Sequence, residues 1–129
     1  MNKSSINKVI LIGRIGGRPE GRYTPSGVSV VKFSLATDES WVDTDNKTQE
    51  HTEWHNVEAW GKVADFVSNY LTKGQLIYIE GKLRSSSWTD KDGINRKKTF
   101  IVCQTVTALE WKKNDSQQDI MNRGSDKET

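Results

Sequence analysis

The stretch Thr52-Glu53-Trp54-His55-Asn56-Val57-Glu58-Ala59-Trp60 has the two-residue alternation of a β-strand. The alternation puts Trp54, Asn56, Glu58 and Trp60 on one face and His55, Val57 and Ala59 on the other. Exposed flat rings on a polar sheet favour stacking with nucleobases, worth about 1 to 3 kcal/mol per base. The strand fits equally well a protein in which both tryptophans pack against another subunit or a loop, so both interpretations stay open.

The residues before this stretch predict a strand, a hairpin and a loop. A buried strand begins at Val9-Ile10-Leu11-Ile12 and runs toward Arg14, and glycines then break the pattern. Arg22-Tyr23-Thr24 leads into the turn Pro25-Ser26-Gly27, and a half-buried strand through Val31, Phe33 and Leu35 completes a hairpin. The polar segment from Asp38 to His51 is expected to be a long projecting loop.

The residues after the stretch predict one helix and two further strands. The apolar positions Val63, Phe66, Val67, Tyr70 and Leu71 follow helical spacing, which ends before Gly74. Alternation from Ile77 to Trp88 predicts a strand whose polar face carries Lys82, Arg84 and Trp88. A turn at 89–93 leads past the basic residues 96–98 into a last strand, Thr99 to Trp111.

Length and composition indicate one modest domain, expected over residues 1–111, and a flexible polar tail over residues 112–129. The formal charge of +2 neither requires nor excludes a polyanionic partner. The single cysteine, Cys103, has no internal disulfide partner, and no apolar run reaches the length of a membrane span. We therefore expect a cytoplasmic protein without membrane contact.

Five strands with one helix between the third and fourth are the element order of an OB-fold, a small Greek-key barrel that binds oligonucleotides. The predicted fold class is therefore all-β with one short helix: a five-stranded OB-fold barrel followed by a disordered C-terminal tail.

Several segments together resemble the bacterial single-stranded DNA-binding protein family, in order and over about the first 110 residues. They are Asn7-Lys8-Val9-Ile10-Leu11-Ile12-Gly13-Arg14, Arg22-Tyr23, Leu35-Ala36-Thr37, Glu39-Ser40-Trp41, Thr52-Glu53-Trp54-His55, Gly61-Lys62, Tyr70-Leu71, Lys73-Gly74, Tyr78-Ile79-Glu80-Gly81 and Trp88-Thr89-Asp90.

The resemblance implies a homotetramer, associated with the nucleoid, that binds single-stranded DNA in replication, recombination and repair. It implies base stacking on Trp41, Trp54, Trp60 and Trp88. It implies phosphate contacts by Arg22, Lys62 and Lys73, to which the pattern around Trp88 adds Arg84, and it places His55 and Tyr78 at the oligomer interface. No catalysis, metal or cofactor is implied.

The chain departs from the family pattern in its charges and at its end. Glu58 adds a negative charge to the aromatic face, and Ser85-Ser86-Ser87 stand where family members often carry cations. The family's acidic tip, which closes with Asp-Ile-Pro-Phe and recruits replication and repair proteins, is replaced by Gly124-Ser125-Asp126-Lys127-Glu128-Thr129. The sequence therefore leaves such partners, and a chromosomal or mobile-element origin, open.

Other sites and functions fit less well. His51 and His55 share a strand face but lack the further ligands of a closed zinc site, and Gly61-Lys62 lacks the rest of a phosphate-binding loop. No catalytic constellation is evident, so we do not expect an enzyme. An RNA-binding protein of the cold-shock kind and a protein-interaction module remain as alternatives.

Overall fold

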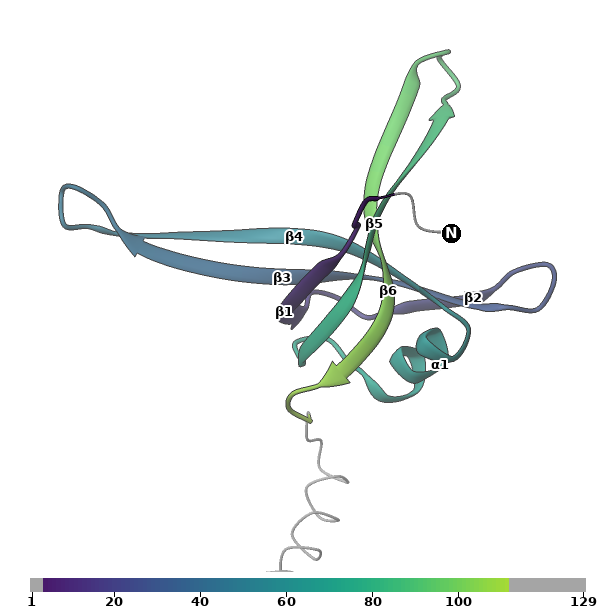
Figure 1. Ribbon diagram of the computed structural model, residues 1–129, viewed down its shortest axis with the longest axis horizontal. Helices are drawn as coiled ribbons and strands as arrows, with labels where there is room; N and C mark the ends of the chain where they lie inside the picture. The colour runs from purple at the N-terminus through teal and green to yellow at the C-terminus, as the bar shows by residue number, and fades with distance from the viewer. Residues whose placement is uncertain (1–3, 112–129) are drawn as a thin grey trace, which may run out of the picture.

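The computed structural model describes residues 4–111, which form six strands and one helix (Figure 1). The elements are β1 (Val9–Ile15), β2 (Glu20–Tyr23), β3 (Ser29–Val42), β4 (Thr48–Trp60), α1 (Gly61–Tyr70), β5 (Leu76–Thr89) and β6 (Asn95–Ala108). The predicted OB-fold class is confirmed. The short β2 is the first arm of the hairpin expected at Arg22-Tyr23-Thr24, and it stands outside the five strands of the barrel. The tail expected over residues 112–129 lies outside the described residues.

The barrel closes through five strands. Hydrogen-bonded neighbours follow the order β1-β5-β6-β4-β3-β2, and a further pairing of β1 with β3 joins Arg14 to Ala36 and Ile15 to Leu35. All strand pairs are antiparallel except β4 and β6, which run parallel. β2 lies outside the closed ring and extends the sheet beyond β3.

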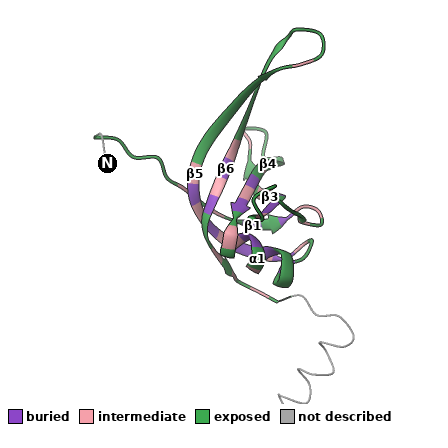
Figure 2. Cartoon of the chain, turned by 90° about the vertical axis from the view of Figure 1, so that its right-hand side faces the viewer, coloured by how far each residue is buried: buried purple, intermediate pink, exposed green. Residues whose placement is uncertain are grey.

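The core fills the barrel with aliphatic side chains that alternate along the strands. Leu35, Val57, Ile77 and Ile79 are almost completely buried, and Figure 2 shows the buried residues gathered on the strands around the barrel interior and on α1. α1 adds its buried Val67 to this core and ends where the backbone N–H of Leu71 donates to the Val67 carbonyl. Among the described residues, no helix is long and apolar enough to cross a membrane.

Two expectations about exposure and loops were wrong. β1 is only half buried, because Ile10 and Ile12 are each 55% exposed while the alternating residues face the core. The segment from Asp38 to His51 is no irregular loop, because β3 and β4 stay paired from Asp38 opposite Thr52 out to Val42 opposite Thr48. The sequence pattern did not predict this pairing, because a two-stranded ribbon exposed on both faces needs no alternation of apolar and polar residues.

Two long hairpins project from the barrel in different directions (Figure 1). We call residues 37–53 of β3 and β4 the β3–β4 arm, and residues 84–100 of β5 and β6 the β5–β6 arm. The last strand starts at Asn95 and ends at Ala108, so it begins and ends earlier than the predicted Thr99 to Trp111. Both arms are therefore continuous extensions of barrel strands.

Glycine permits a close approach of two strands at two points in the barrel. A Cβ added at Gly13 would lie 2.3 Å from the Ala36 carbonyl oxygen on β3. At Gly81, beside the bulge at Glu80/Gly81, an added Cβ would lie 2.1 Å from the carbonyl oxygen of Val102. Any larger residue would push two paired strands apart at these points.

Replacing Gly81 by Ala is expected to lower the free energy of unfolding by about 1 to 3 kcal/mol, because the new methyl group meets backbone that has little room to move. Gly17→Ala is the control, since nothing lies within 4 Å of its Cβ position, and we expect a change within about 0.5 kcal/mol. Urea unfolding followed by circular dichroism measures both. Equal stability of the two variants would contradict the proposed close approach.

Candidate nucleic-acid interface

The strands β2, β3 and β4 present one continuous face away from the core. Direct pairing aligns Arg22 with Val30 and Trp60 across the three strands. Because side chains alternate along a strand, every second residue of β4 from Trp60 back to Trp54 lies on the same face. The two tryptophans are six residues apart, which corresponds to about 20 Å along the strand.

The same face continues onto the β5–β6 arm. Glu58 on β4 pairs with Val102 on the parallel strand β6, so the alternating residues of β6 out to Arg96 share the face of Glu58. Their partners on β5 include Arg84 and Trp88. We call this surface the outer face; it contains Arg22, Val30, Lys32, Ser34, Ala36, Trp54, Asn56, Glu58, Trp60, Arg84, Ser86, Trp88, Arg96, Lys98 and Phe100.

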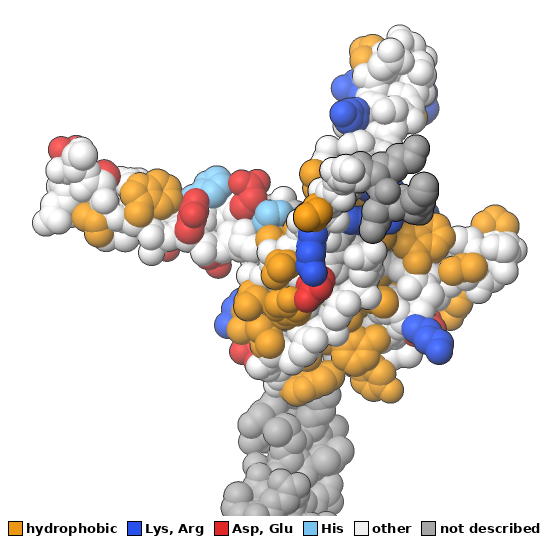
Figure 3. Space-filling view, viewed as in Figure 1, with side chains coloured by type: hydrophobic (Ala, Val, Ile, Leu, Met, Phe, Trp, Pro, Cys, Tyr) orange, Lys and Arg blue, Asp and Glu red, His pale blue; other side chains and the backbone are white. Residues whose placement is uncertain are grey.

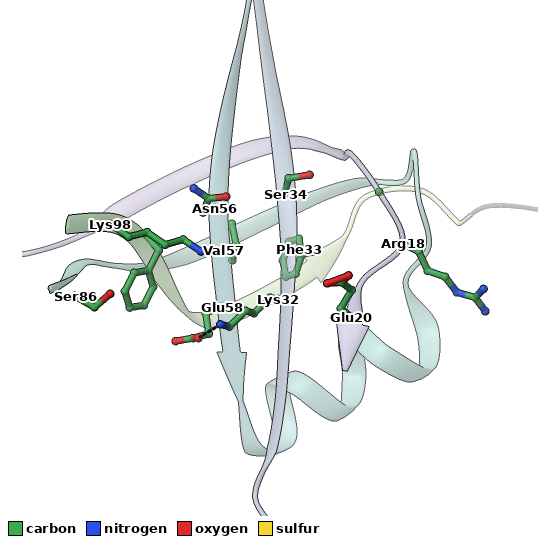
Figure 4. A pocket seen from close by; sticks show the side chains of 12 residues that line it. Arg18, Glu20, Lys32, Phe33, Ser34, Asn56, Val57, Glu58, Ser86 and Lys98 are labelled. Carbon is green, nitrogen blue, oxygen red and sulfur yellow. Dashed lines mark ion pairs between the residues drawn. The ribbon is translucent and has the colours of Figure 1, made fainter. Parts of the chain in front are cut away.

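A groove of about 480 Å³ runs across the middle of the outer face (Figure 4). Asn56 and Glu58 of β4 line it beside Lys32 of β3, and Lys98 with Phe100 approaches from β6. Lys32 and Glu58 form an ion pair of 3.8 Å within it. The groove therefore combines an aromatic ring with amide, hydroxyl and cationic groups. Of its two lysines, Lys32 is paired with Glu58, whereas Lys98 forms no ion pair among the described residues.

The tryptophans of the outer face are accessible, with 56%, 45% and 48% of Trp54, Trp60 and Trp88 exposed. The Trp54 ring lies over Gly16, where an added Cβ would approach a ring carbon to 2.2 Å. The Trp60 indole N–H donates to Glu58 at 3.2 Å, which fixes the direction of that ring. These rings can accept a flat partner from solvent.

The cations of the outer face differ in their partners. Within residues 4–111, Arg22, Arg84 and Lys98 form no ion pair within 4 Å. Arg96 pairs with Asp90 at 2.8 Å, and this guanidinium lowers the pKa of the Asp90 carboxyl, helped by the backbone N–H groups of the turn. The unpaired cations are thus the ones available to an anion.

Three of the expected contact residues lie off the outer face. Trp41 pairs with Gln49 and is five residues from Ala36, the partner of Trp54, so strand alternation puts it on the opposite face of the β3–β4 arm. Lys62 is exposed on α1, and Lys73 is exposed in the connection between α1 and β5. Their roles in DNA binding stay predictions.

The two expected interface residues lie on separate strands. His55 is half-buried on β4 beside Thr37, whose hydroxyl oxygen is 2.9 Å from its Nε2. Tyr78 on β5 pairs with the exposed Ile12 of β1 and donates its phenol proton to Glu80. That hydrogen bond raises the pKa of Tyr78 and, together with the ammonium of Lys8 at 3.3 Å, lowers the pKa of Glu80.

Sequence reasoning missed several residues of this surface. Gly16 was counted only among the glycines that break the pattern after Arg14, although it makes room for the Trp54 ring. Lys98 and Phe100 were assigned only to the start of the last strand. Their two-residue spacing places both side chains on the face of Glu58 once β6 is known to lie beside β4. Around His51 and His55, and elsewhere in residues 4–111, no three His, Cys, Asp or Glu side chains are grouped to hold a metal ion.

Comparison with known proteins gives consistent results. The model of the single-strand binding protein family matches residues 6–109. "Single-stranded DNA-binding protein 1" of Chlorobaculum tepidum is 51% identical over 105 residues, covering 81% of this chain and 65% of that protein. The single-stranded DNA-binding protein of Neisseria meningitidis is 47% identical over 105 residues, covering 81% of this chain and 60% of its own length. The chain thus spans less than two thirds of these relatives.

Solved structures show the same barrel. The Plasmodium falciparum SSB in complex with ssDNA superimposes with a TM-score of 0.78 at 32% identity, covering 85% of this chain and 100% of that one. A deletion mutant of the single-stranded DNA binding protein from Thermus aquaticus gives a TM-score of 0.71 at 33% identity, covering 81% of this chain and 51% of that one. The match over residues 6–109, the sequence identity and the shared fold agree: this chain belongs to the single-strand binding protein family.

Proposed function

We propose that this protein binds single-stranded DNA with little sequence preference. The observation that carries the proposal is the outer face, on which Trp54, Trp60 and Trp88 are exposed together with cations that have no ion-pair partner among the described residues. Relatives in the family are named for single-stranded DNA binding, and a solved relative is a complex with ssDNA.

Stacking on the tryptophans explains preference for unpaired strands. Every base has a flat face that fits an indole ring, and each stacked base contributes about 1 to 3 kcal/mol whatever its identity. A duplex hides these faces between neighbouring base pairs, so it offers only its backbone. The spacing of about 20 Å between Trp54 and Trp60 leaves room for several nucleotides between the two rings.

Phosphate contacts add affinity and make it depend on salt. Arg22 lies on the same face as Trp60, with Val30 between them, and Arg84 lies on the same face as Trp88, so bases stacked on these two rings would have a cation near the path of their backbone. Neutralising a phosphate releases condensed counterions, which lowers the logarithm of affinity by about 0.7 per contact for each tenfold rise in salt. Lys98 is an additional candidate beside the groove.

The same proposal includes the wider role and the residues that lie off the outer face. A binder of unpaired strands would protect and organise them in replication, recombination and repair. Trp41, Lys62 and Lys73 stay candidates for an extended DNA path, and recruitment of replication and repair proteins stays an open part of the proposal. Residues 1–111 would be the binding domain and residues 112–129 a polar tail.

The exposed apolar surface of β1 supports assembly into a homotetramer. Ile10 and Ile12 stand on the same face of β1, with Tyr78 directly opposite Ile12, and Figure 3 shows hydrophobic side chains gathered over this strand. Burial of such side chains against another copy removes them from water at about 25 cal/mol per Å². His55 would join this assembly from the face opposite Trp54.

Titration with oligo(dT), followed by intrinsic tryptophan fluorescence, tests the function itself. We expect strong quenching by oligo(dT), weaker affinity at higher salt, and little quenching by a duplex of equal length. Oligo(U) is a further arm, because equal or tighter binding to it would favour an RNA-binding protein. An unquenched signal with every strand would overturn the proposal.

Separate Trp54→Ala and Trp88→Ala variants test the stacking residues. Each is expected to weaken oligo(dT) binding by about 1 to 3 kcal/mol through the loss of one stacked base. Trp111→Ala is the matched control, since Trp111 is 53% exposed but lies beside α1, with its ring 6.4 Å from Phe66. Fluorescence anisotropy of a labelled oligonucleotide measures all three, and equal losses in all three variants would contradict the assignment.

Replacing Ile12 by Asp tests the assembly. A charge on the β1 surface is expected to convert the tetramer into a smaller species, because the carboxylate would lose its hydration in an apolar contact. Val28→Asp in the exposed turn between β2 and β3 is the control and should leave the assembly intact. Sedimentation velocity gives the masses. An unchanged mass for Ile12→Asp would remove β1 from the interface.

A further inference from the structure

Glu58 is a carboxylate in the middle of the surface proposed to bind an anionic strand. Its side chain is 16% exposed and lines the groove of the outer face beside Asn56, which lies two residues earlier on β4. A negative charge at this place repels phosphate, so attraction to the DNA backbone gives no reason for it. The contacts of Glu58 indicate what else the carboxylate can bind.

The two oxygens of the Glu58 carboxylate have different partners. Oε2 accepts the indole N–H of Trp60 at 3.2 Å. Oε1 lies 3.8 Å from Nζ of Lys32, a distance that allows charge attraction but is longer than a hydrogen bond. No donor within residues 4–111 forms a hydrogen bond to Oε1, so its lone pairs are free to accept one.

A free amide and an aromatic ring lie in the same groove as this oxygen. The side chain of Asn56 is exposed, and its amide forms no hydrogen bond with any other residue of the described part of the chain. Phe100 lines the groove from β6, the strand that runs parallel to β4. Asn56 and Glu58 are separated by about 7 Å along β4, a spacing that the edge of one base can bridge.

A base with an exocyclic amino group matches these three side chains. Stacking on the Phe100 ring is possible for every base. An ionised carboxylate only accepts hydrogen bonds, so Glu58 attracts the amino group of cytosine or adenine and repels the O4 carbonyl of thymine or uracil. In cytosine and adenine the ring nitrogen next to the amino group is an acceptor, and the Asn56 amide can donate to it.

We propose that Glu58 gives the outer face a preference for amino-bearing bases at one position. The base lies against Phe100, its amino group donates to Oε1 of Glu58, and its ring nitrogen accepts from Asn56. The tryptophans stack bases of any identity, so this preference is local and modest. The inference rests on the proposed single-strand binding and names the class of base for one site within it.

Discrimination comes from the wrong base as well as from the right one. A base that covers Glu58 without donating to it displaces water from a charged oxygen and leaves that oxygen unsatisfied. The amino group of cytosine replaces the lost water, whereas the O4 carbonyl of uracil does not. The N3–H of uracil is a donor, but it stands between two carbonyls that the same carboxylate repels.

Oligo(dC) and oligo(dU) of equal length test the preference, because their bases differ only at ring positions 3 and 4. Fluorescence anisotropy of the labelled strands gives the ratio of their two affinities for the native chain and for Glu58→Gln. Differences between the free strands cancel when the two proteins are compared. We expect the ratio to favour oligo(dC) in the native chain by about three- to tenfold more than in Glu58→Gln.

The Glu58→Gln substitution keeps the length of the side chain and an acceptor for the Trp60 indole. Its amide can turn to accept from an amino group or to donate to a carbonyl, so it serves both bases. Affinity for both strands should rise because a negative charge is removed. Glu58→Met, which keeps the length without a strong acceptor, should reduce the ratio at least as far.

Glu20→Gln is the matched control for charge. Glu20 faces Lys32 from β2, and Figure 4 shows it on the side of the groove where Arg18 lies, away from Ser86 and Lys98. Loss of this carboxylate should raise the affinity for both strands and leave their ratio as in the native chain. An equal change of the ratio in Glu20→Gln and Glu58→Gln would assign the preference to the net charge of the groove and overturn the role of Glu58.

A strand built from 2-pyrimidinone deoxynucleotides isolates the amino group, because this base lacks the amino group of cytosine without gaining a carbonyl in its place. The native chain should bind it more weakly than oligo(dC), and Glu58→Met should bind the two strands alike. Equal binding of both strands by the native chain, or an unchanged ratio of oligo(dC) to oligo(dU) in Glu58→Gln, would overturn the proposal. Failure of single-strand binding itself would show instead as no binding of the native chain to any of these strands.

Discussion

The pairing of β1 with β3 is the constraint on which the rest of the structure depends. Only two residue pairs join these strands, yet they close the sheet and leave β3, β4, β5 and β6 to continue past the barrel. Closure also divides each strand into a core side and an outward side. Because the outward sides of the five strands β2 to β6 are joined through the pairing of β4 with β6, residues as far apart in sequence as Arg22 and Phe100 share one surface.

Charge is distributed unevenly over that fold. The groove between Lys32, Asn56 and Lys98 mixes polar and charged side chains with an apolar, partly aromatic wall, whereas the two arms carry net charges of opposite sign. Surface ion pairs contribute little to stability, so this pattern has little bearing on folding. It bears on what approaches the molecule and from which side, since fields of several charges act over about 10 Å at ordinary ionic strength.

The fold was largely predictable from alternation. Val57 and Ala59 against Trp54 and Trp60 located the part of β4 from Thr52 to Trp60, and the apolar spacing from Val63 to Leu71 located α1. The β3–β4 arm was missed because its residues are polar on both faces and follow no apolar period. The outer face could be assembled only in part, since the contribution of Phe100 depends on which strand lies beside β4, and that neighbour is far away in sequence.

Gly16 and Glu58 have a consequence for the dynamics of the aromatic surface. The Trp54 ring rests over bare backbone, and the Trp60 ring is tied through its N–H to a carboxylate that also pairs with Lys32. A side chain held in this way has already lost much of its rotamer freedom in the free protein. Each such ring would therefore give up little conformational entropy on stacking against a flat partner, and more of the stacking free energy would be retained as affinity.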